Sequence, residues 1–196
     1  MISREEALKI IEKKVSNNNI IKHMFALEAF MGAIWDGLKK KGIKETELGG
    51  TKEEWMMVGL LHDGDYCEEV PNEKQGIRIS EWVKEKGFEV PENVCHAMAS
   101  HNYATGVKPK SLMDWTAFIG DSLTGLVVAS TLVLPTKKLS DLTVESILKK
   151  FKSSSFAKGT RRQDIILCEE KLGFSLEEFI GICLKSMQKI SNDLGL

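Results

Sequence analysis

The chain lacks a long run of apolar residues. None reaches the ~18 residues that a membrane-spanning helix needs, and the longest candidate, Ile119 to Leu134, is interrupted by Asp121. The amino terminus, Met1 to Glu6, carries too much charge for a secretory signal peptide. These absences predict a cytoplasmic protein that has no membrane as a partner.

An excess of charge of one sign is also missing. The 27 lysine and arginine residues nearly balance the 28 aspartate and glutamate residues, which leaves a formal net charge of −1. A protein that binds nucleic acid or an anionic membrane by charge usually carries a basic surplus. We therefore expect no nucleic acid polymer among the partners.

Cysteine is scarce, and its spacing does not suit a disulfide framework. The four cysteines lie far apart and form no Cys-x-x-Cys pair: Cys67, Cys95, Cys168 and Cys183. In a reducing compartment such residues behave as small core hydrophobes. We expect no disulfide bond.

Sustained alternation of apolar and polar residues is absent, so a β-sheet is not expected. Helical periodicity instead covers nearly the whole chain, and signals such as Ser3-x-x-Glu6 and Ser111-x-x-Asp114 mark helix starts. The predicted helices span approximately residues 3–15, 20–40, 52–61, 73–86, 91–101, 111–134, 141–151, 160–172 and 175–193. Because no repeat or low-complexity linker divides the chain, residues 1–196 predict one all-α, multi-helix domain.

The dipeptide His62-Asp63 is the most informative feature that is present. It ends an apolar helical segment, Trp55 to Gly64, so that an imidazole and a carboxylate leave the same helix end. Both side chains are metal ligands. Gly59, one turn before Asp63, would let another helix approach closely. A His-Asp pair is common by chance, however, so a metal site needs further ligands from elsewhere in the chain.

His62 shares an inward helical stripe with Val58, and two other predicted helices also carry a ligand-type residue on an inward stripe. His23 shares a helical face with Leu27. Asp121 aligns with Ala117, and a buried carboxylate is costly unless it is paired or bound to a cation. Each has a structural alternative: a satisfied core histidine, or an aspartate that bonds a neighbouring helix. Together with His62-Asp63 they favour a metal site.

This ordered set of His23, His62-Asp63 and Asp121 resembles the HD-domain superfamily of metal-dependent phosphohydrolases. That family carries a His on one helix, a His-Asp pair on another and an Asp on a later helix. The resemblance covers an HD-like core of about residues 20–130. The helical C-terminal extension, about residues 135–196, resembles small stand-alone prokaryotic members. An HD-domain-like bundle is therefore the expected fold.

The resemblance implies roles for particular residues. One divalent metal ion would be coordinated by His23, His62, Asp63 and Asp121. His101 occupies the position that many members use for a second metal ion or for the substrate phosphate. Where many members carry a further His, near a Glu-His-Gly sequence, this chain has Lys74-Gln75-Gly76. Glutamine is a poor metal ligand, which weakens the expectation of a second ion.

Two imidazoles and two carboxylates form a mixed nitrogen and oxygen ligand set. Such a set suits Mn²⁺, Fe²⁺, Co²⁺, Ni²⁺ or Zn²⁺, with Mg²⁺ also open, and argues against the all-oxygen cage of calcium. The predicted catalytic residues are Asp63, Asp65 and His101, of which Asp65 or His101 would position water or protonate the leaving oxygen. Asp65 has an alternative interpretation as a helix-end or turn residue.

A basic segment lies around the serines at 153–155, which form the only flexible-looking joint. Its positive charges are Lys149, Lys150, Lys152, Lys158, Arg161 and Arg162. If the segment covers the metal site, Lys158 or Arg161 would bind a phosphate of the substrate through charge-assisted hydrogen bonds. A solvated basic surface is the alternative.

His96 and the tryptophans receive structural interpretations. His96 lies roughly 140° round its helix from His101, at about 100° per residue, so we expect it to be structural or exposed. The tryptophans lie at helical spacing: Trp35, Trp55, Trp82 and Trp115. They fit a core or a subunit interface, which leaves a homo-oligomer open.

These observations predict a metal-dependent phosphohydrolase, either a phosphomonoesterase or a phosphodiesterase. Its substrate would be a small phosphorylated metabolite, and a nucleotide is suggested by the resemblance alone. The alternative is a non-catalytic HD-like module that binds a nucleotide or a metal ion. A structural all-α protein with a polar core network is the third interpretation.

Overall fold

The computed structural model describes residues 1–196, and its secondary structure is entirely helical. The α-helices are α1 (Arg4–Lys14), α2 (Asn18–Lys40), α3 (Glu45–Leu48), α4 (Lys52–Leu61), α5 (Arg78–Glu85), α6 (Glu92–Ser100), α7 (Leu112–Leu132), α8 (Val144–Phe151), α9 (Arg162–Ile165), α10 (Cys168–Leu172), α11 (Leu176–Lys189) and α12 (Ser191–Leu194). Short 3-10 turns cover Asn72–Lys74, Tyr103–Thr105 and Leu139–Asp141. The predicted all-α fold is confirmed.

Helix starts follow local capping chemistry. The side chains of Thr51, Ser111 and Ser175 each accept a hydrogen bond from the backbone amide three residues on. An acidic residue at that third position bonds back to the capping residue's own amide, which completes a capping box. These short-range bonds satisfy amides that the helix itself leaves free, so these starts can be read from the sequence.

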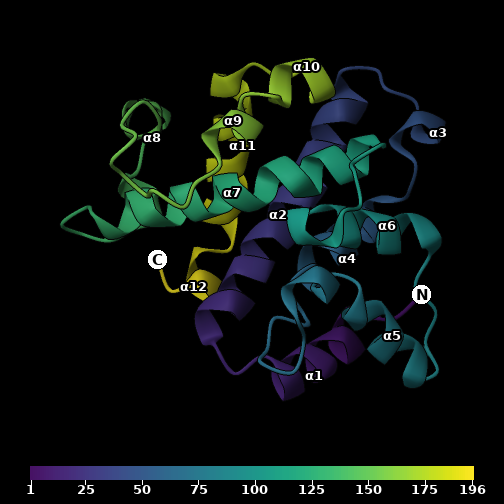
Figure 1. Ribbon diagram of the computed structural model, residues 1–196. Coiled ribbons are helices and arrows are strands. Elements are labelled where there is room, and N and C mark those ends of the chain that lie inside the picture. Colours follow the sequence, from purple (N-terminus) through teal and green to yellow (C-terminus); the bar gives the residue numbers. More distant parts are fainter.

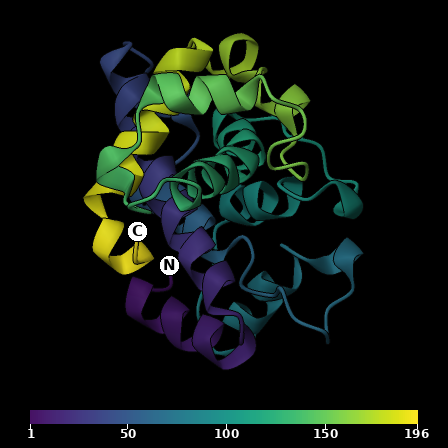
Figure 2. The ribbon, with the colours of Figure 1, turned by 90° about the vertical axis from the view of Figure 1, so that its left-hand side faces the viewer.

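The two longest helices, α2 and α7, organise the core (Figure 1). Helix α2 packs most extensively against α4, and it also contacts α7 and α11. Figure 2 shows α11, in yellow, along one side of α2, while the teal segments lie on the other. The buried apolar residues form one continuous cluster that runs from Ile2 to Leu194. The C-terminal helices therefore contribute to the same core as the N-terminal ones.

Helix α7 is the one helix that is long and apolar enough to cross a membrane by length and composition. Two thirds of its most apolar window (67%) is buried inside the molecule, as in any core helix. It packs against α2, α6, α9, α10 and α11.

The predicted helix at 73–86 is wrong in its first third. A 3-10 turn covers Asn72–Lys74, and α5 begins only at Arg78. Between them Gly76 adopts φ +86°, where a Cβ would lie 2.5 Å from the Met98 carbonyl oxygen. The tight contact with α6 selects this turn, and periodicity alone does not reveal such a contact.

Other predicted boundaries need smaller corrections. The predicted helix at 160–172 is two short helices, α9 and α10, separated by a turn at Ile166 and Leu167. The predicted helix at 141–151 begins at Val144, after the 3-10 turn, and that at 175–193 is divided at Ile190. The apolar spacing continues across each break, so the pattern does not mark it.

Candidate metal centre

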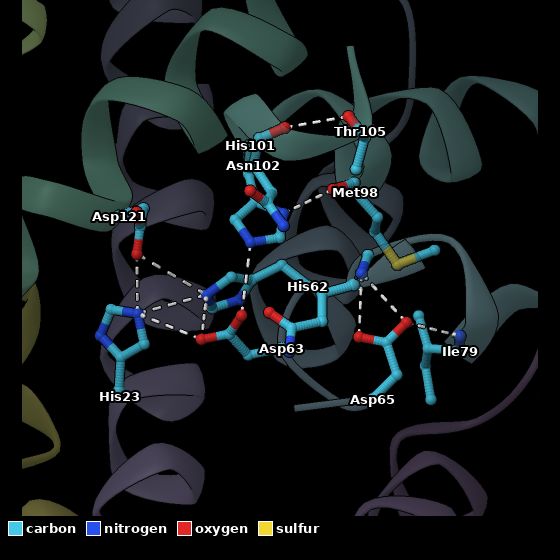
Figure 3. Close-up of polar contacts among 12 residues, drawn as sticks. His23, His62, Asp63, Asp65, Ile79, Met98, His101, Asn102, Thr105 and Asp121 are labelled. Carbon is cyan, nitrogen blue, oxygen red and sulfur yellow. Dashed lines mark hydrogen bonds and ion pairs between the residues drawn. The ribbon is translucent and has the colours of Figure 1, made fainter. Parts of the chain in front are cut away.

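Two histidines meet between α2 and α4. His23 lies in the first half of α2, and His62 is the residue that caps the C-terminal end of α4. Their Nε2 atoms are 3.2 Å apart (Figure 3). The inward stripes predicted for both residues are confirmed, because Leu27 and Val58 beside them are fully buried. The His62 side chain is itself fully buried, and that of His23 is 19% exposed.

Gly59 makes this approach possible, as its position one turn before Asp63 predicts. A Cβ at Gly59 would lie 2.5 Å from the backbone nitrogen of Glu28 and 2.6 Å from its Cα. Real side chains do not tolerate contacts of this length, so any larger residue would push α4 away from α2. Helix backbones that touch at Gly59 hold the two imidazoles together.

The two predicted aspartates complete the group. Asp63 follows His62 in the turn after α4, and Asp121 lies in the middle of α7. The Nε2 atom of His23 is 2.9 Å from Oδ1 of Asp121 and 3.9 Å from Oδ2 of Asp63. The Nε2 atom of His62 is 3.5 Å from Oδ2 of Asp63 and 4.0 Å from Oδ1 of Asp121. Residues from three distant parts of the sequence therefore converge.

These separations suit ligands of a single ion. Ligand bonds of about 2.1 Å place neighbouring ligand atoms about 3.0 Å apart and opposite ones about 4.2 Å apart. The measured distances of 2.9 to 4.0 Å lie in that range. His23, His62 and Asp63 form a group whose ligand atoms all lie within 4.8 Å of one another, so the group could hold a metal ion.

Hydrogen bonds to the outer ring nitrogens direct lone pairs into the group. The Nδ1 atom of His62 lies 2.8 Å from the Gly59 carbonyl oxygen, which only accepts, so Nδ1 carries the hydrogen and Nε2 the lone pair. Thr124 donates its hydroxyl hydrogen to the Asp121 carbonyl, and its oxygen can then accept from Nδ1 of His23 at 3.3 Å. With the outer nitrogens bonded in this way, each imidazole directs its Nε2 lone pair into the group whenever it is neutral.

The two carboxylates of the group are ionised, and its most deeply buried imidazole is neutral. Burial lowers the pKa of His62 to about 4, so this imidazole is neutral near pH 7. Burial raises the pKa of Asp63, but the neighbouring histidines outweigh it and hold the pKa near 2. In the same way the hydrogen bond from His23 holds the pKa of Asp121 below its usual range. Two anions and a lone pair converge, an arrangement that favours a proton on His23 or a metal ion between them.

His101, at the C-terminal end of α6, is also part of the group. Its Nδ1 atom donates to the Met98 carbonyl oxygen, and its Nε2 atom lies 3.3 Å from Oδ1 of Asp63. Its ring meets that of His62 edge to face at 4.8 Å. Burial lowers the pKa of His101, but the hydrogen bond to Asp63 and its charge outweigh burial and raise the pKa to about 9. His101 therefore places an N–H group at the rim of the centre.

Asp65 adopts the turn position that the sequence left open. Its buried carboxylate accepts hydrogen bonds from the amides of Gly76, at 2.8 and 3.0 Å, and Ile79, at 2.8 Å. Burial raises the pKa of Asp65 to about 6. Figure 3 shows this carboxylate turned toward these amides and away from the histidines. Its bonds support the bend before α5, which favours the structural interpretation over a catalytic one.

Gln75 makes its hydrogen bond to the Val70 carbonyl oxygen, at 3.4 Å, rather than to the histidine group. His96 pairs with Asp114, 2.9 Å away on α7, and has a structural role, as its helical position predicts. The sequence predicts the tryptophans in the core or at a subunit interface. Trp55 and Trp82 are buried in the core, and Trp35 and Trp115 pack against it while partly exposed.

The basic segment divides into two kinds of residue. Arg161 donates to Oδ2 of Asp121 at 2.9 Å and to Asp164 at 2.9 Å, so it buttresses a residue of the centre. Lys158 is exposed and forms no ion pair. Both line a cavity of about 350 Å³ that reaches His23 and Asp121. The sequence pointed to Arg161 as a phosphate ligand, whereas its contact with Asp121 depends on tertiary structure.

Two side chains, Tyr103 and Thr124, support the centre in ways that the sequence does not predict. Tyr103 donates to the buried Asp164 at 2.6 Å, and the Arg161 guanidinium lies over the Tyr103 ring. Thr124 orients His23 as described above, and its only signal in the sequence is its position one turn after Asp121. No family model, curated protein or solved structure matches the chain, so the centre is interpreted from its own residues.

Proposed function

We propose that the protein is a metal-dependent phosphohydrolase of the HD-domain type, in which His23, His62, Asp63 and Asp121 hold one divalent cation. The proposal is carried by the two imidazole Nε2 atoms, which lie 2.9 to 4.0 Å from one another and from carboxylate oxygens of Asp63 and Asp121. Outer hydrogen bonds to Gly59 and Thr124 add support, because metal-binding histidines are usually oriented in this way.

A bound divalent ion supplies a Lewis acid for phosphoryl chemistry and a lowered pKa for coordinated water. The protein's own residues would bind and orient the substrate. Lys158 and Arg161 line the cavity beside Asp121 and bring positive charge to a phosphoryl group. His101 carries an N–H at Nε2, 3.3 Å from Asp63, and can donate it to an oxygen of the substrate.

Metal content and phosphatase activity test the proposal together. Protein purified without chelator is assayed for bound metal and for hydrolysis of p-nitrophenyl phosphate and bis(p-nitrophenyl) phosphate, with Mn²⁺, Fe²⁺, Co²⁺, Ni²⁺, Zn²⁺ or Mg²⁺ added. We expect His62→Ala and Asp63→Ala each to lower both metal content and activity at least a hundredfold. The matched control is His96→Gln, which alters a histidine outside the centre and should retain both. Activity that persists in both centre variants would refute the assignment.

A module that binds a nucleotide or a metal ion without hydrolysis is the second candidate. Gln75 favours this candidate, because it stands where a further histidine would serve a second ion. Its side chain bonds to the Val70 carbonyl oxygen and not to the centre. The same experiment separates the two functions. Metal binding that depends on His62, without turnover of any phosphate ester, supports the module over the enzyme.

A further inference from the structure

Gly125 is a helical glycine that packing does not explain. It is exposed, near the middle of α7 and one turn beyond Asp121. Glycine destabilises a helix interior relative to alanine. A Cβ at Gly59 or Gly120 would collide with a neighbour at 2.5 or 2.9 Å, whereas a Cβ at Gly125 would meet no heavy atom within 4 Å. The predicted inward stripe that contains Asp121 therefore emerges at the surface here, and the space in front of it is open.

Two cavities border this open space, and His23 and Gly125 line both of them. The first, of about 350 Å³, contains Asp121 and the basic residues of the 158–161 loop. The second, of about 460 Å³, lies where the first half of α2, the second half of α7 and the C-terminal residues come together (Figure 1). Each has the size of a small-molecule site.

The second cavity differs in chemistry from the first. Its walls are mainly aliphatic and come from Val128, Ala129, Leu132, Leu194 and Leu196. Leu132 is 49% exposed although it is a large apolar residue. Lys22 also lines this cavity, so a positive charge lies beside the aliphatic surface. The 158–161 loop supplies positive charge to the first cavity. A ligand that spans both cavities would combine an anionic group with an apolar one.

We propose that the aliphatic cavity binds the apolar group of a phosphate ester whose phosphoryl group lies at the histidine and aspartate centre. This assignment rests on the proposed function. The absence of a side chain at Gly125 keeps the passage between the two cavities open. The substrate class is therefore a phosphate ester of an alcohol with an apolar portion, which is a hydrocarbon chain or a nucleobase. A small polar sugar phosphate would leave the aliphatic surface uncovered.

The experiment compares two phosphonates, which are not hydrolysed, by calorimetry at saturating Mn²⁺. Methylphosphonate carries only the anionic group, and octylphosphonate adds a hydrocarbon chain. We expect octylphosphonate to bind the wild-type protein at least tenfold more tightly. Gly125→Leu, which fills the passage, should remove this advantage of octylphosphonate over methylphosphonate and leave the Mn²⁺ affinity unchanged, and Gly125→Ala should reduce the advantage partly.

Further variants test whether the effect of Gly125→Leu is specific to the aliphatic cavity. Leu132 lines the second cavity but not the first, so Leu132→Asn should weaken the binding of octylphosphonate and not that of methylphosphonate. Gly181→Ala changes a helical glycine on α11, away from both cavities, and should change none of the affinities. A nucleoside 5′-phosphonate serves as a third ligand, and a Gly125-dependent gain that exceeds the octyl gain identifies a base as the occupant.

The possible results separate this inference from the proposed function. If Mn²⁺ and methylphosphonate bind but neither apolar group adds affinity, or if Gly125→Leu leaves the gain intact, the inference is overturned and the proposed function stands. If Mn²⁺ does not bind, the experiment is repeated with Fe²⁺, Co²⁺, Ni²⁺, Zn²⁺ and Mg²⁺. If none of these ions binds, or if neither phosphonate binds, both are overturned. Thermal unfolding of each variant establishes that the fold is retained.

Discussion

At the scale of single residues, the outer Nδ1 atoms of His23 and His62 decide the chemistry of the centre. Gly59 and Thr124 occupy the outer nitrogens of His62 and His23, so the inner Nε2 atoms face one another and the carboxylates. Such an arrangement favours a positive charge within it. A metal ion that binds there should therefore stabilise the folded state.

We expect Mn²⁺ at a hundredfold excess over its dissociation constant to raise the free energy of unfolding by about 2.7 kcal/mol, because the ion binds only the folded chain. Urea denaturation with and without Mn²⁺ measures this difference. His62→Ala should abolish the increase, and His96→Gln should preserve it. Equal stabilisation of all three proteins would place the ion elsewhere.

Two glycines should respond in opposite ways to the same substitution. Gly59→Ala places a methyl group 2.5 Å from the Glu28 backbone, so we expect a loss of about 1–3 kcal/mol. Gly125→Ala meets open space on an exposed helical face, so we expect a gain of about 0.5–1 kcal/mol. Urea unfolding of the two variants gives the signs directly, and a destabilised Gly125→Ala protein would show that the space at residue 125 is not open.

At the scale of elements, short α9 is attached to the long core helix α7 through one arginine. Arg161 joins Asp121 on α7 to Asp164 on α9 and also donates to the Phe118 carbonyl oxygen at 3.3 Å. Arg162 donates to the carbonyl oxygens of Phe151 and Ser153, which ties the loop after α8 to α9. The two arginines of the basic segment therefore act as braces, and Lys158 is its exposed residue near the cavity.

Arg161→Ala should destabilise the protein by about 3 kcal/mol, because it leaves the buried carboxylate of Asp164 with only the Tyr103 hydroxyl as a partner. Lys158→Ala forms the control, since Lys158 is exposed and unpaired, and its effect should stay within about 0.5 kcal/mol. Chemical denaturation compares the two. Similar effects of both substitutions would mean that the arginine braces contribute little.

The elements also show where periodicity stops being informative. The caps at Thr51, Ser111 and Ser175 lie within four residues of the amides they satisfy, so the sequence predicts these starts. The bend before α5 depends on Asp65, eleven and fourteen residues away from the amides it binds. No local pattern contains that bond, and the predicted helix at 73–86 is too long for this reason.

At the scale of the whole molecule, the C-terminal extension and the N-terminal helices share one core. Helix α11 packs against both α2 and α7. Phe179 on α11 meets Phe30 on α2 edge to face, with ring centroids 5.0 Å apart. A shared core of this kind unfolds as one cooperative unit.

Unfolding by urea should therefore give the same midpoint by two probes. Tryptophan fluorescence reports residues 35 to 115, where all four tryptophans lie, and far-UV circular dichroism reports every helix. Phe179→Ala should cost about 3–5 kcal/mol and lower both midpoints together. If Phe179→Ala moved part of the circular dichroism transition to a lower urea concentration and left the fluorescence midpoint unchanged, the extension would unfold separately.

The buried and partly exposed cysteines should react at different rates. Cys168 and Cys183 are fully buried, and burial raises the pKa of the Cys168 thiol to about 11, whereas Cys67 and Cys95 are partly exposed. We expect a thiol reagent at pH 8 to label two cysteines quickly in the native protein and four in denaturant. Rapid labelling of all four would contradict the packing of α10 and α11.

The sequence by itself determined the helical class, most helix starts and the inward faces that carry His23 and His62. These properties follow from caps and from residues three or four positions apart, which interact within one helix. Tertiary structure alone decided how close the imidazoles and carboxylates come, the bracing of Asp121 by Arg161, and the meeting of two cavities at Gly125. His23 and Asp121, for example, are 98 positions apart in the sequence, and the distance between them depends on how helices pack.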